Sequence, residues 1–219
     1  MRLTSRSALV LFGIGAVGGL VGDACHVASG TTEYLDDSLP FVWKSQLWFP
    51  LAVGLATVAT GELRLRLGPA PAGESGSGGA AIDRDPIRDP RGHDLTEALA
   101  AVASVIAIYA LSAVVTDEDP LSATVLIWAL ALLVLARFGG GRPALICATA
   151  AAVLGPLAEV LVVEVELSRY SVDADGLLGV AEWLPALYFA FGVVAARLAE
   201  LLAARSSRRR RAADARRSA

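Results

Sequence analysis

The segment Leu121–Phe138, LSATVLIWALALLVLARF, decides the fold class. It carries no charge before Arg137, and about 18 residues of helix at about 1.5 Å each cover most of a hydrocarbon core about 30 Å thick. Such a segment predicts a transmembrane helix. The turn Gly139-Gly140-Gly141-Arg142-Pro143 and a second apolar segment at 144–164 follow it, so we expect an antiparallel helical hairpin in a membrane.

The rest of the chain repeats this pattern. Hydrophobic residues make up 55% of the sequence, charged residues only 19%, and the mean hydropathy is +0.56, which excludes an ordinary soluble domain, a secreted disulfide scaffold and a disordered chain. We expect an all-α polytopic membrane protein in which residues 1–204 form one six-helix transmembrane domain. The expected spans are residues 8–27, 47–65, 95–115, 121–138, 144–164 and 180–202. Residues 68–94 are rich in Gly, Pro and Ser and predict a flexible loop.

The positions of the basic residues predict the orientation. When alternate loops are assigned to opposite sides, 17 of the 19 Lys and Arg residues lie on the side of the N-terminus, and only Lys44 and Arg169 lie on the other. Basic loops stay in the cytoplasm, so we expect both termini to be cytoplasmic. The predominance of Arg over Lys, with abundant Ala and Gly, is typical of a GC-rich bacterial genome and indicates a bacterial inner membrane.

The two ends of the chain each allow two interpretations. Gly22-Asp23-Ala24 has the small residues of a signal-peptidase site, but cleavage there would leave five spans, so we interpret the first span as a retained helix. The tail at 205–219 contains four consecutive arginines. We expect this cytoplasmic tail to bind anionic lipid of the inner leaflet, at about 1 kcal/mol per charge, rather than nucleic acid.

Glycines in the first span predict close helix packing. Gly15 and Gly19 are four residues apart, as are Gly18 and Gly22, which gives one helix face without side chains. Such faces allow transmembrane helices to approach one another closely. We therefore expect a homo-oligomer, such as a trimer.

Glu159 is the foremost candidate for function. An ionisable side chain within the hydrocarbon core raises the free energy of the protein, and such residues usually bind a ligand or transfer protons. The preceding Gly155-Pro156 removes a backbone donor from the helix. The carboxyl group could bind a polar lipid headgroup or relay protons. An interhelical hydrogen bond by a protonated Glu159 is the equally supported structural alternative.

Asp23 and His26 form a second candidate pair, three residues apart on one face of the first span. They could transfer protons or bind a metal, but there is no third ligand of the right kind, so an ion pair at the interface is the favoured interpretation. Trp43, Trp48 and Trp183 lie at the outer boundary of their spans. They suit either an anchoring belt or the mouth of a lipid cavity.

Enzymes are disfavoured. The sequence has no GxSxG nucleophile elbow, no HExxH and no phosphate-binding GxxxxGK[ST]. It holds two histidines in all, His26 and His93. A Ser–His site would therefore depend on His26 alone, at an unsuitable depth.

The order of several motifs resembles the Insig (insulin-induced gene) family of six-span regulators of sterol homeostasis. Ser45-Gln46-Leu47-Trp48-Phe49-Pro50 is similar to the family's serine followed by Trp-Val-Pro, and Leu121-Ser122 to the family's Leu-Ser-Leu helix. Glu159-Val-Leu-Val162 falls where the family has Gln-Phe-Leu-Val. Tyr170-Ser171, Ala174-Asp175 and Trp183-Leu184-Pro185 resemble its Tyr-Thr, Pro-Asp-Phe and Trp-Leu-Pro.

This resemblance implies a non-enzymatic lipid-binding protein without a cofactor. In the family, a cavity among the helices takes an oxysterol, and the loaded protein retains a sterol-sensing escort protein and HMG-CoA reductase. Glu159 replaces a glutamine thought to face the ligand, and Asp175 matches a loop aspartate needed for partner binding. The residues expected to bind lipid are Glu159, Gln46, Trp48, Trp183 and Pro156.

The chain also departs from the family. Its loop at 68–94 is unlike the family's loop. Because a typical bacterium makes no cholesterol, a diacylglycerol-like lipid whose hydroxyl reaches Glu159 or Gln46 is a more plausible ligand than a sterol-like one. The alternative function is a small secondary transporter that uses Glu159 with Asp23 and His26. Transporters of this kind usually contain internal repeats, and the two halves of this chain show no obvious correspondence.

Overall fold

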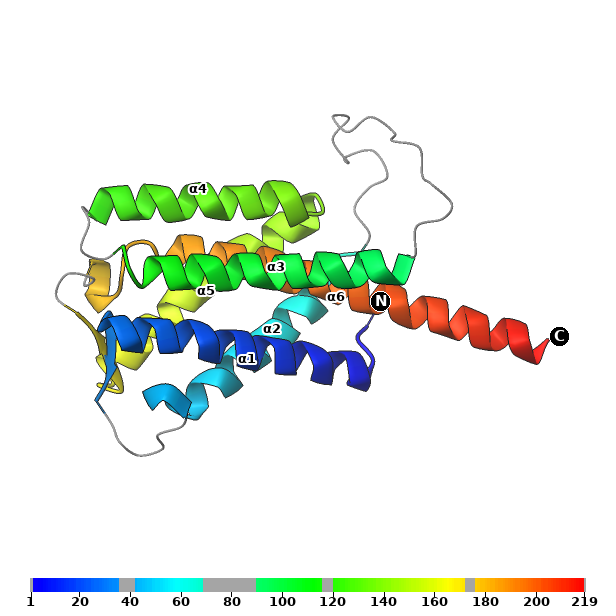
Figure 1. The fold of residues 1–219 in the computed structure, drawn as a ribbon, viewed down its shortest axis with the longest axis horizontal. Coiled ribbons are helices and arrows are strands. Elements are labelled where there is room, and N and C mark those ends of the chain that lie inside the picture. Colours follow the sequence, from blue (N-terminus) through cyan, green and yellow to red (C-terminus); the bar gives the residue numbers. More distant parts are fainter. Residues whose placement is uncertain (1, 36–41, 69–89, 116–119, 172–175, 219) are drawn as a thin grey trace.

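The computed structural model describes residues 2–35, 42–68, 90–115, 120–171 and 176–218. Long helices account for most of these residues: α1 (Ser5–Ser29), α2 (Trp48–Arg66), α3 (Pro90–Ser112), α4 (Pro120–Phe138), α5 (Arg142–Glu164) and α6 (Leu184–Arg217). They run alongside one another as a bundle (Figure 1). The short elements are the strands β1 (Thr32–Tyr34) and β2 (Ser168–Tyr170) and the 3-10 turns η1 (Val42–Lys44) and η2 (Leu177–Gly179).

Five of the six helices are long and apolar enough to cross a membrane. The exception is α2, where Glu62, Arg64 and Arg66 lower the hydropathy of one end. It nevertheless packs against α1 and α6 within the bundle. The chain is therefore a six-helix, multi-pass membrane protein, as the apolar segments predict.

Local signals in the sequence explain where several helices begin and end. The side chain of Thr4 caps α1 by accepting a hydrogen bond from the Ser7 amide. At the other end, Gly30 takes a left-handed φ of 78°, a conformation that glycine adopts at little cost. The turn between α4 and α5 depends in the same way on Gly141, with a φ of 71°, and Pro143 then opens α5.

Two helices extend further than the expected spans. The first turns of α3, from Pro90, lie inside the segment expected to be a loop, and α6 continues through the expected tail to Arg217. Figure 1 shows this last part of α6 leaving the bundle along the helix axis. The tail is therefore a continuous helix rather than a separate segment.

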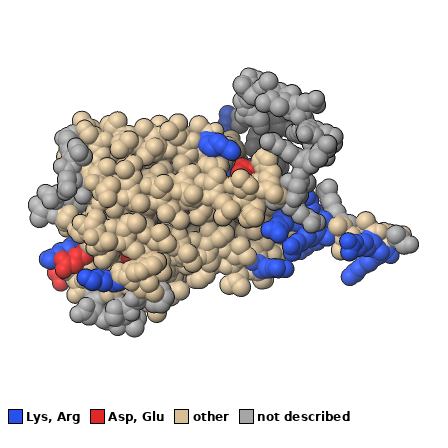
Figure 2. All heavy atoms as spheres, in the orientation of Figure 1, with Lys and Arg blue, Asp and Glu red and all other residues tan. Residues whose placement is uncertain are grey.

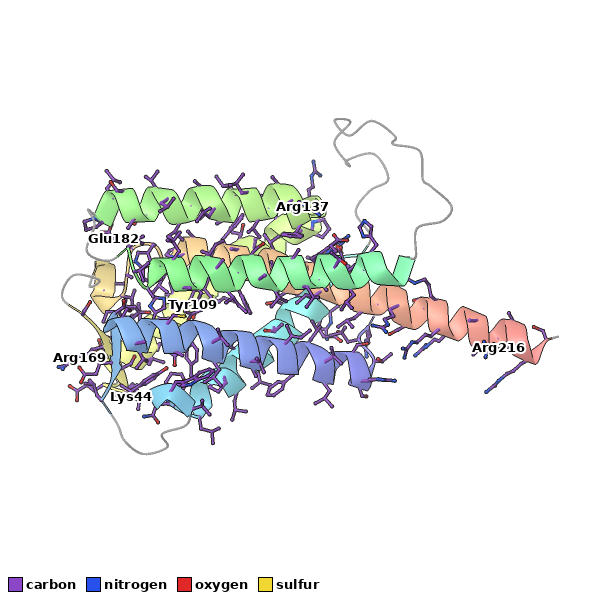
Figure 3. The ribbon with its side chains drawn as sticks, viewed as in Figure 1. Lys44, Tyr109, Arg137, Arg169, Glu182 and Arg216 are labelled. Atoms are coloured by element: carbon purple, nitrogen blue, oxygen red, sulfur yellow. The ribbon has the colours of Figure 1, made fainter. Side chains whose placement is uncertain are left out.

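The charges divide the surface into two ends with a broad uncharged band between them (Figure 2). Both termini lie at the end that carries most of the arginines, with Arg137 and Arg216, whereas Lys44 and Arg169 lie at the opposite end (Figure 3). By the positive-inside rule the arginine-rich end is cytoplasmic. We call it the inner end and the opposite one the outer end.

Helix α6 is the centre of the bundle. Of the 18 most apolar consecutive residues in α6, 67% are buried, against 11 to 28% of the corresponding residues in the other four helices that could cross a membrane. It contacts each of the other five helices. The apolar residues of α1, α3, α4 and α5 are left largely on the outside, where hydrocarbon chains would cover them.

The glycine face of α1 is used within the chain. A Cβ at Gly15 would lie 2.0 Å from Thr57 Oγ1, and one at Gly19 would lie 2.8 Å from a methyl group of Val53, both on α2. A Cβ at Gly22 would lie 2.5 Å from the ring of Tyr109, on α3. Most of this face therefore serves contacts inside one protomer, and it is not the oligomer surface that its spacing indicates.

Candidate functional site

A cavity of about 370 Å³ lies among α1, α2, α3, α5 and α6. Small and aliphatic residues form most of its wall. They include Gly15 and Gly19 of α1, Val53 of α2, Val105 of α3 and Ala151 of α5. The two glycines let α2 approach α1 closely on this side of the cavity, and Leu187, Val194 and Leu198 of α6 line it from another side.

Polar groups in this cavity gather toward the outer end. Trp48 is the first residue of α2, Tyr109 lies three residues before the end of α3, and Tyr188 lies in the first turns of α6. Glu159 of α5 joins them, and its Oε1 accepts a hydrogen bond of 2.6 Å from the Tyr188 hydroxyl. The site therefore combines a long apolar wall with hydrogen-bonding groups at one end.

Gly155 explains how Tyr188 reaches Glu159. A Cβ at Gly155 would lie 2.2 Å from the ring of Tyr188, so only glycine lets the ring lie flat against α5. Helix α5 continues through the adjacent Pro156 without interruption. Pro156 is not among the described residues that line the cavity, whereas Gly155 is. Of the two residues Gly155 and Pro156, it is therefore Gly155 that shapes the site, because it allows Tyr188 to reach Glu159.

A second, smaller space of about 20 Å³ adjoins the outer end of the cavity, and Trp48, Tyr109 and Glu159 line both. Its other polar lining residues are Asp23, His26, Thr32, Tyr34, Ser168, Tyr170 and Trp183. We call this space the polar chamber. Its volume suits a hydroxyl group or a single water molecule.

Asp23 and His26 both line the polar chamber, but they have different partners. Asp23 Oδ1 accepts a hydrogen bond of 2.9 Å from the Tyr34 hydroxyl, and His26 Nε2 lies 3.1 Å from Ser112 Oγ. Neither residue forms an ion pair within the described part of the chain, so the expected interfacial pair is wrong. Both side chains are buried, and a buried polar group is stabilised by a hydrogen bond with a neutral hydroxyl group at a lower desolvation cost than an ion pair would have.

Two polar atoms in the chamber lack a close hydrogen-bond partner. Asp23 Oδ2 and Thr32 Oγ1 are both buried and lack a close hydrogen bond among the described residues, although the Ser45 hydroxyl lies beside the Asp23 carboxyl. Burial, reinforced by the Asp23 carboxyl, raises the pKa of Tyr34, so its hydroxyl stays protonated and remains a donor. The chamber can therefore accept a further hydrogen-bond donor, such as a hydroxyl group or water.

The structure brings together most of the residues that the sequence singled out. Glu159 and Trp48 line both spaces, and Trp183, which is 4% exposed, lines the chamber. Gln46 is buried immediately before α2, but it is not among the described lining residues of either space. Asp175 lies outside the described residues.

Four tyrosines of the site were not identified as site residues from the sequence: Tyr34, Tyr109, Tyr188 and Tyr170, of which Tyr170 was quoted only for its resemblance to a family motif. They lie on two strands and two helices and are far apart in sequence, so no local spacing connects them. Among the described residues, no group of three or more His, Cys, Asp or Glu lies close enough to hold a metal ion. The chemistry of this site is that of hydroxyl and carboxyl groups.

The inner end of the cavity is closed by a different kind of structure. Leu63 of α2 and Leu198 of α6 line its inner end, and each is next to a charged residue. Arg64 Nη2 lies 2.5 Å from Glu200 Oε1, and Arg197 Nη1 lies 2.6 Å from Glu200 Oε2.

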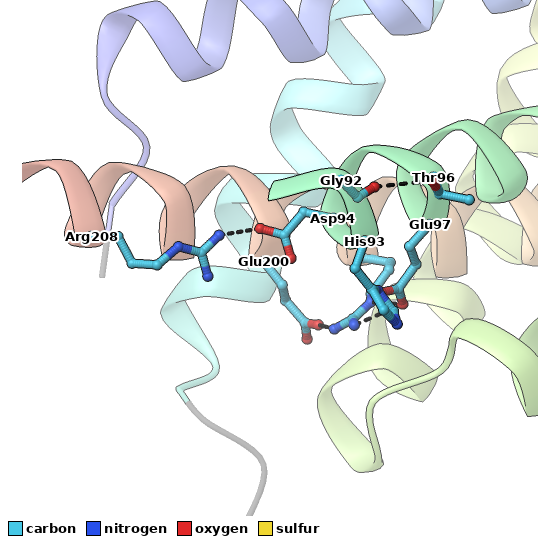
Figure 4. Close-up of polar contacts among 8 residues, drawn as sticks. Gly92, His93, Asp94, Thr96, Glu97, Glu200 and Arg208 are labelled. Atoms are coloured by element: carbon cyan, nitrogen blue, oxygen red, sulfur yellow. Dashed lines mark hydrogen bonds and ion pairs between the residues drawn. The ribbon is translucent and has the colours of Figure 1, made fainter. Parts of the chain in front are cut away.

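Arg197 completes the cluster through Glu97 of α3, whose Oε1 accepts a hydrogen bond of 2.9 Å from Arg197 Nε. We call Arg64, Glu97, Arg197 and Glu200 the ion-pair cluster. Nearby, Arg208 on the extension of α6 forms an ion pair with Asp94 (Figure 4). These contacts join α2, α3 and α6.

Comparisons with known proteins agree with this architecture. No protein-family model matches the chain. An INSIG protein homolog of Mycolicibacterium vanbaalenii is 43% identical over 205 residues, which cover 94% of this chain and 91% of that protein. The crystal structure of a mycobacterial Insig homolog, MvINS from Mycobacterium vanbaalenii, has a TM-score of 0.79 and 43% identity over 94% of this chain and 98% of its own. A cross-linked trimer of an MvINS variant also has a TM-score of 0.79, with 42% identity over the same shares.

Proposed function

The chain belongs to the Insig family, and on this premise we propose that it is a non-enzymatic membrane protein that binds and senses an amphipathic lipid. The observation that carries the proposal is the cavity of about 370 Å³, which is apolar along its walls and has Glu159, Tyr188 and Tyr109 at its outer end. Its volume lies in the range of about 300–1,000 Å³ typical of small-molecule sites.

The polar groups define the class of lipid. The chamber and the adjoining outer end of the cavity contain two carboxyl groups, Asp23 and Glu159, and no Lys or Arg among their described lining residues. A phosphate would meet like charge there, whereas a hydroxyl can donate to a carboxyl oxygen and accept from a tyrosine. A neutral lipid with a free hydroxyl, diacylglycerol-like or sterol-like, fits this arrangement.

The same residues support a role in binding rather than catalysis. Cys147 is the only described cysteine that lines the cavity. Its thiol donates a hydrogen bond to the carbonyl of Thr60 on α2, so no base accepts its proton. His26, which lines the chamber at the outer end, lies 3.1 Å from Ser112 Oγ, the arrangement of a base beside a nucleophile. Ser112, however, is 0% exposed, donates to the Tyr109 carbonyl and is not among the described lining residues of either space, so its hydroxyl does not face a ligand.

We further propose that the protein resides in a bacterial inner membrane as a homo-oligomer. The cross-linked trimer of the MvINS variant supports a trimer for this chain. Arg205, Arg208 and Arg209 follow the expected end of the last span within about 10 Å along the helix, so they can reach the anionic headgroups of the inner leaflet. Asp175 is the proposed contact for a protein partner, by its resemblance to the family's loop aspartate.

Lipid analysis of the purified protein tests the proposal. Mass spectrometry of lipids that copurify in detergent should show one neutral hydroxyl-bearing class enriched over the bulk membrane. Glu159→Ala should reduce its amount about tenfold, because a hydrogen bond to a carboxylate contributes about 1.5–3 kcal/mol. Glu164→Ala is the matched control, since Glu164 is exposed on the same helix and lines neither space. A lipid profile identical to that of the bulk membrane would contradict the proposal.

A proton-coupled transporter is the second candidate function. One observation favours it: Asp23, His26 and Glu159, from two helices, line the same chamber. Reconstituted vesicles should then show a solute-dependent proton flux that Glu159→Gln abolishes. Absence of flux with neutral lipids and with small polar solutes, in vesicles whose protein still binds lipid, would leave lipid sensing as the function.

A further inference from the structure

The cavity is exposed to the bilayer along one side only. The described lining residues that are also exposed on the surface of the protein are Ala52, Ala56, Ala59, Leu154 and Ala158. All of them lie on α2 or α5. Leu154 is 65% exposed although it lines the cavity. The mouth of the cavity therefore lies between these two helices.

The packing of α2 and α5 leaves this mouth open. Helix α5 packs mainly on α6, and α2 mainly on α1, so few residues join α2 directly to α5. One such contact is the hydrogen bond of 3.9 Å from Cys147 Sγ to the Thr60 carbonyl. Both of these residues lie on the inner side of the exposed alanines, so the two helices meet below the mouth.

The depth of the mouth follows from helix geometry. Ala52 and Ala59 lie about 6 and 16 Å along α2 from Trp48, its outermost residue, at about 1.5 Å per residue. Ala158 and Leu154 lie about 9 and 15 Å along α5 from Glu164, its outermost residue. Half of the hydrocarbon core is about 15 Å thick, so the mouth extends through its outer half and reaches the midplane at Ala59 and Leu154.

The described residues cover the other routes into the cavity. At the inner end, the ion-pair cluster joins α2 to α3 and α6 directly behind Leu63 and Leu198. At the outer end, the polar chamber is covered by β1 and β2, which pair antiparallel from Thr32 to Tyr170. The described residues therefore leave no path from the aqueous phase into the cavity at either end.

We propose that the gap between α2 and α5 is a lateral portal through which the ligand passes from the outer half of the bilayer into the cavity. This inference rests on the proposed lipid binding and adds the route of uptake. The alanines set the width of the portal, because larger side chains at the same positions would fill it. Once inside, the hydroxyl end of the lipid lies next to Glu159, which is one residue from Ala158 on α5.

Uptake kinetics test the portal. The probe is a diacylglycerol with a fluorescent acyl chain, delivered to proteoliposomes, and binding is followed by energy transfer from protein tryptophans. Ala56→Trp and Ala158→Trp should each slow uptake at least about tenfold relative to the variant's own level at saturation, because a narrowed opening limits the rate at which the probe enters. Rates are compared after normalisation to the transfer measured at saturation.

Two matched variants serve as controls. Val153→Trp places the same side chain on α5 at an exposed residue that does not line the cavity, and Leu67→Trp places it at the inner end beyond α2. Both should take up the probe within about twofold of the unmodified rate. Slowing by Leu67→Trp as large as that by Ala56→Trp would place the route in the inner half and overturn the proposal.

A reversible cross-link provides a second test that does not depend on a bulky substitution. Ala56→Cys and Ala158→Cys are introduced in a chain with Cys25→Ser and Cys147→Ser, and a short disulfide-forming bifunctional reagent joins them. Uptake should stop after cross-linking and return on reduction. Equal rates before and after cross-linking would overturn the portal while lipid binding stands. If the unmodified protein binds no diacylglycerol at all, the proposed function itself fails.

Discussion

The two ends of the cavity use polar residues in opposite ways. At the inner end, the ion-pair cluster has two arginines against two glutamates, and Glu200 and Arg197 each have two partners. At the outer end, Asp23 and Glu159 have hydroxyl partners from tyrosines and no described cation, and one oxygen of Asp23 lacks a close hydrogen bond.

This difference separates stability from binding. In the inner cluster two arginines neutralise two glutamates, and Arg64 Nε is its one described buried atom without a partner, so loss of a member leaves an unpaired charge in a medium of low dielectric constant. A set of carboxyl and hydroxyl groups with an unused acceptor can bind another hydroxyl. The inner end therefore holds helices together, and the outer end carries the proposed recognition of a lipid hydroxyl.

The largest effect is expected at the inner end. Glu200→Ala leaves Arg64, whose side chain is 7% exposed, and Arg197 without their shared counter-charge. The free energy of unfolding should fall by about 3 kcal/mol. Thermal unfolding in detergent measures it. An unchanged unfolding midpoint would show that the cluster does not hold α2 and α6 together.

At the outer end, Gly155→Ala should act on Tyr188. The added Cβ would overlap its ring, so the ring must move and lose its hydrogen bond with Glu159. We expect about 2 kcal/mol of destabilisation from overpacking, together with loss of copurifying lipid. In a Tyr188→Ala protein the same glycine substitution should cost little further stability, because the ring that the Cβ overlaps is gone, and the lipid should stay low. A normal amount of lipid in the Tyr188→Ala protein would mean that Tyr188 has no part in binding.

Tyr34→Phe isolates one hydrogen bond of the polar chamber. The ring stays edge-on to Trp48, at a centroid distance of 6.1 Å, but Asp23 loses the hydroxyl that donates to it. The free energy of unfolding should fall by about 1 kcal/mol. Tyr34→Leu, which also removes the ring, should cost more. Equal losses in the two variants would assign the effect to the ring alone.

The smallest effect is expected for an ion pair outside the membrane. Glu33 and Arg169 face each other across β1 and β2, 2.7 Å apart, and both side chains are 62% exposed. Glu33→Gln should change the free energy of unfolding by about 0.5 kcal/mol, and salt should screen even this. Unfolding midpoints at low and high salt measure it. A loss as large as that from Glu200→Ala would remove the distinction between buried and exposed pairs.

The sequence predicted the helices and Glu159 because both depend on local signals. Apolar segments have the length that a bilayer demands, and a single carboxylate stands out in such a segment. The partners could not be predicted in this way. Tyr188 resembles any aromatic residue of an apolar helix until α5 and α6 are packed, and Arg64 meets Glu200 only across the bundle.

The glycines and the strands show the same limit. The spacing of Gly15 and Gly19 correctly predicts a smooth face, but spacing does not say whether the helix on that face belongs to the same chain. Strands β1 and β2 are three residues long and lie in separate loops, so neither has a periodic pattern of its own. Their pairing depends on where α1 and α5 end.

The straight course of α6 has a mechanical consequence. The same helix lines the cavity at Leu198 and ends at Arg217, about 28 Å further along its axis. One helix thus connects the wall of the cavity with the end of the arginine-rich segment. A rotation of about 10° at the cavity displaces the tip of the helix by about 5 Å. A small movement of the cavity wall therefore becomes a larger movement at Arg217.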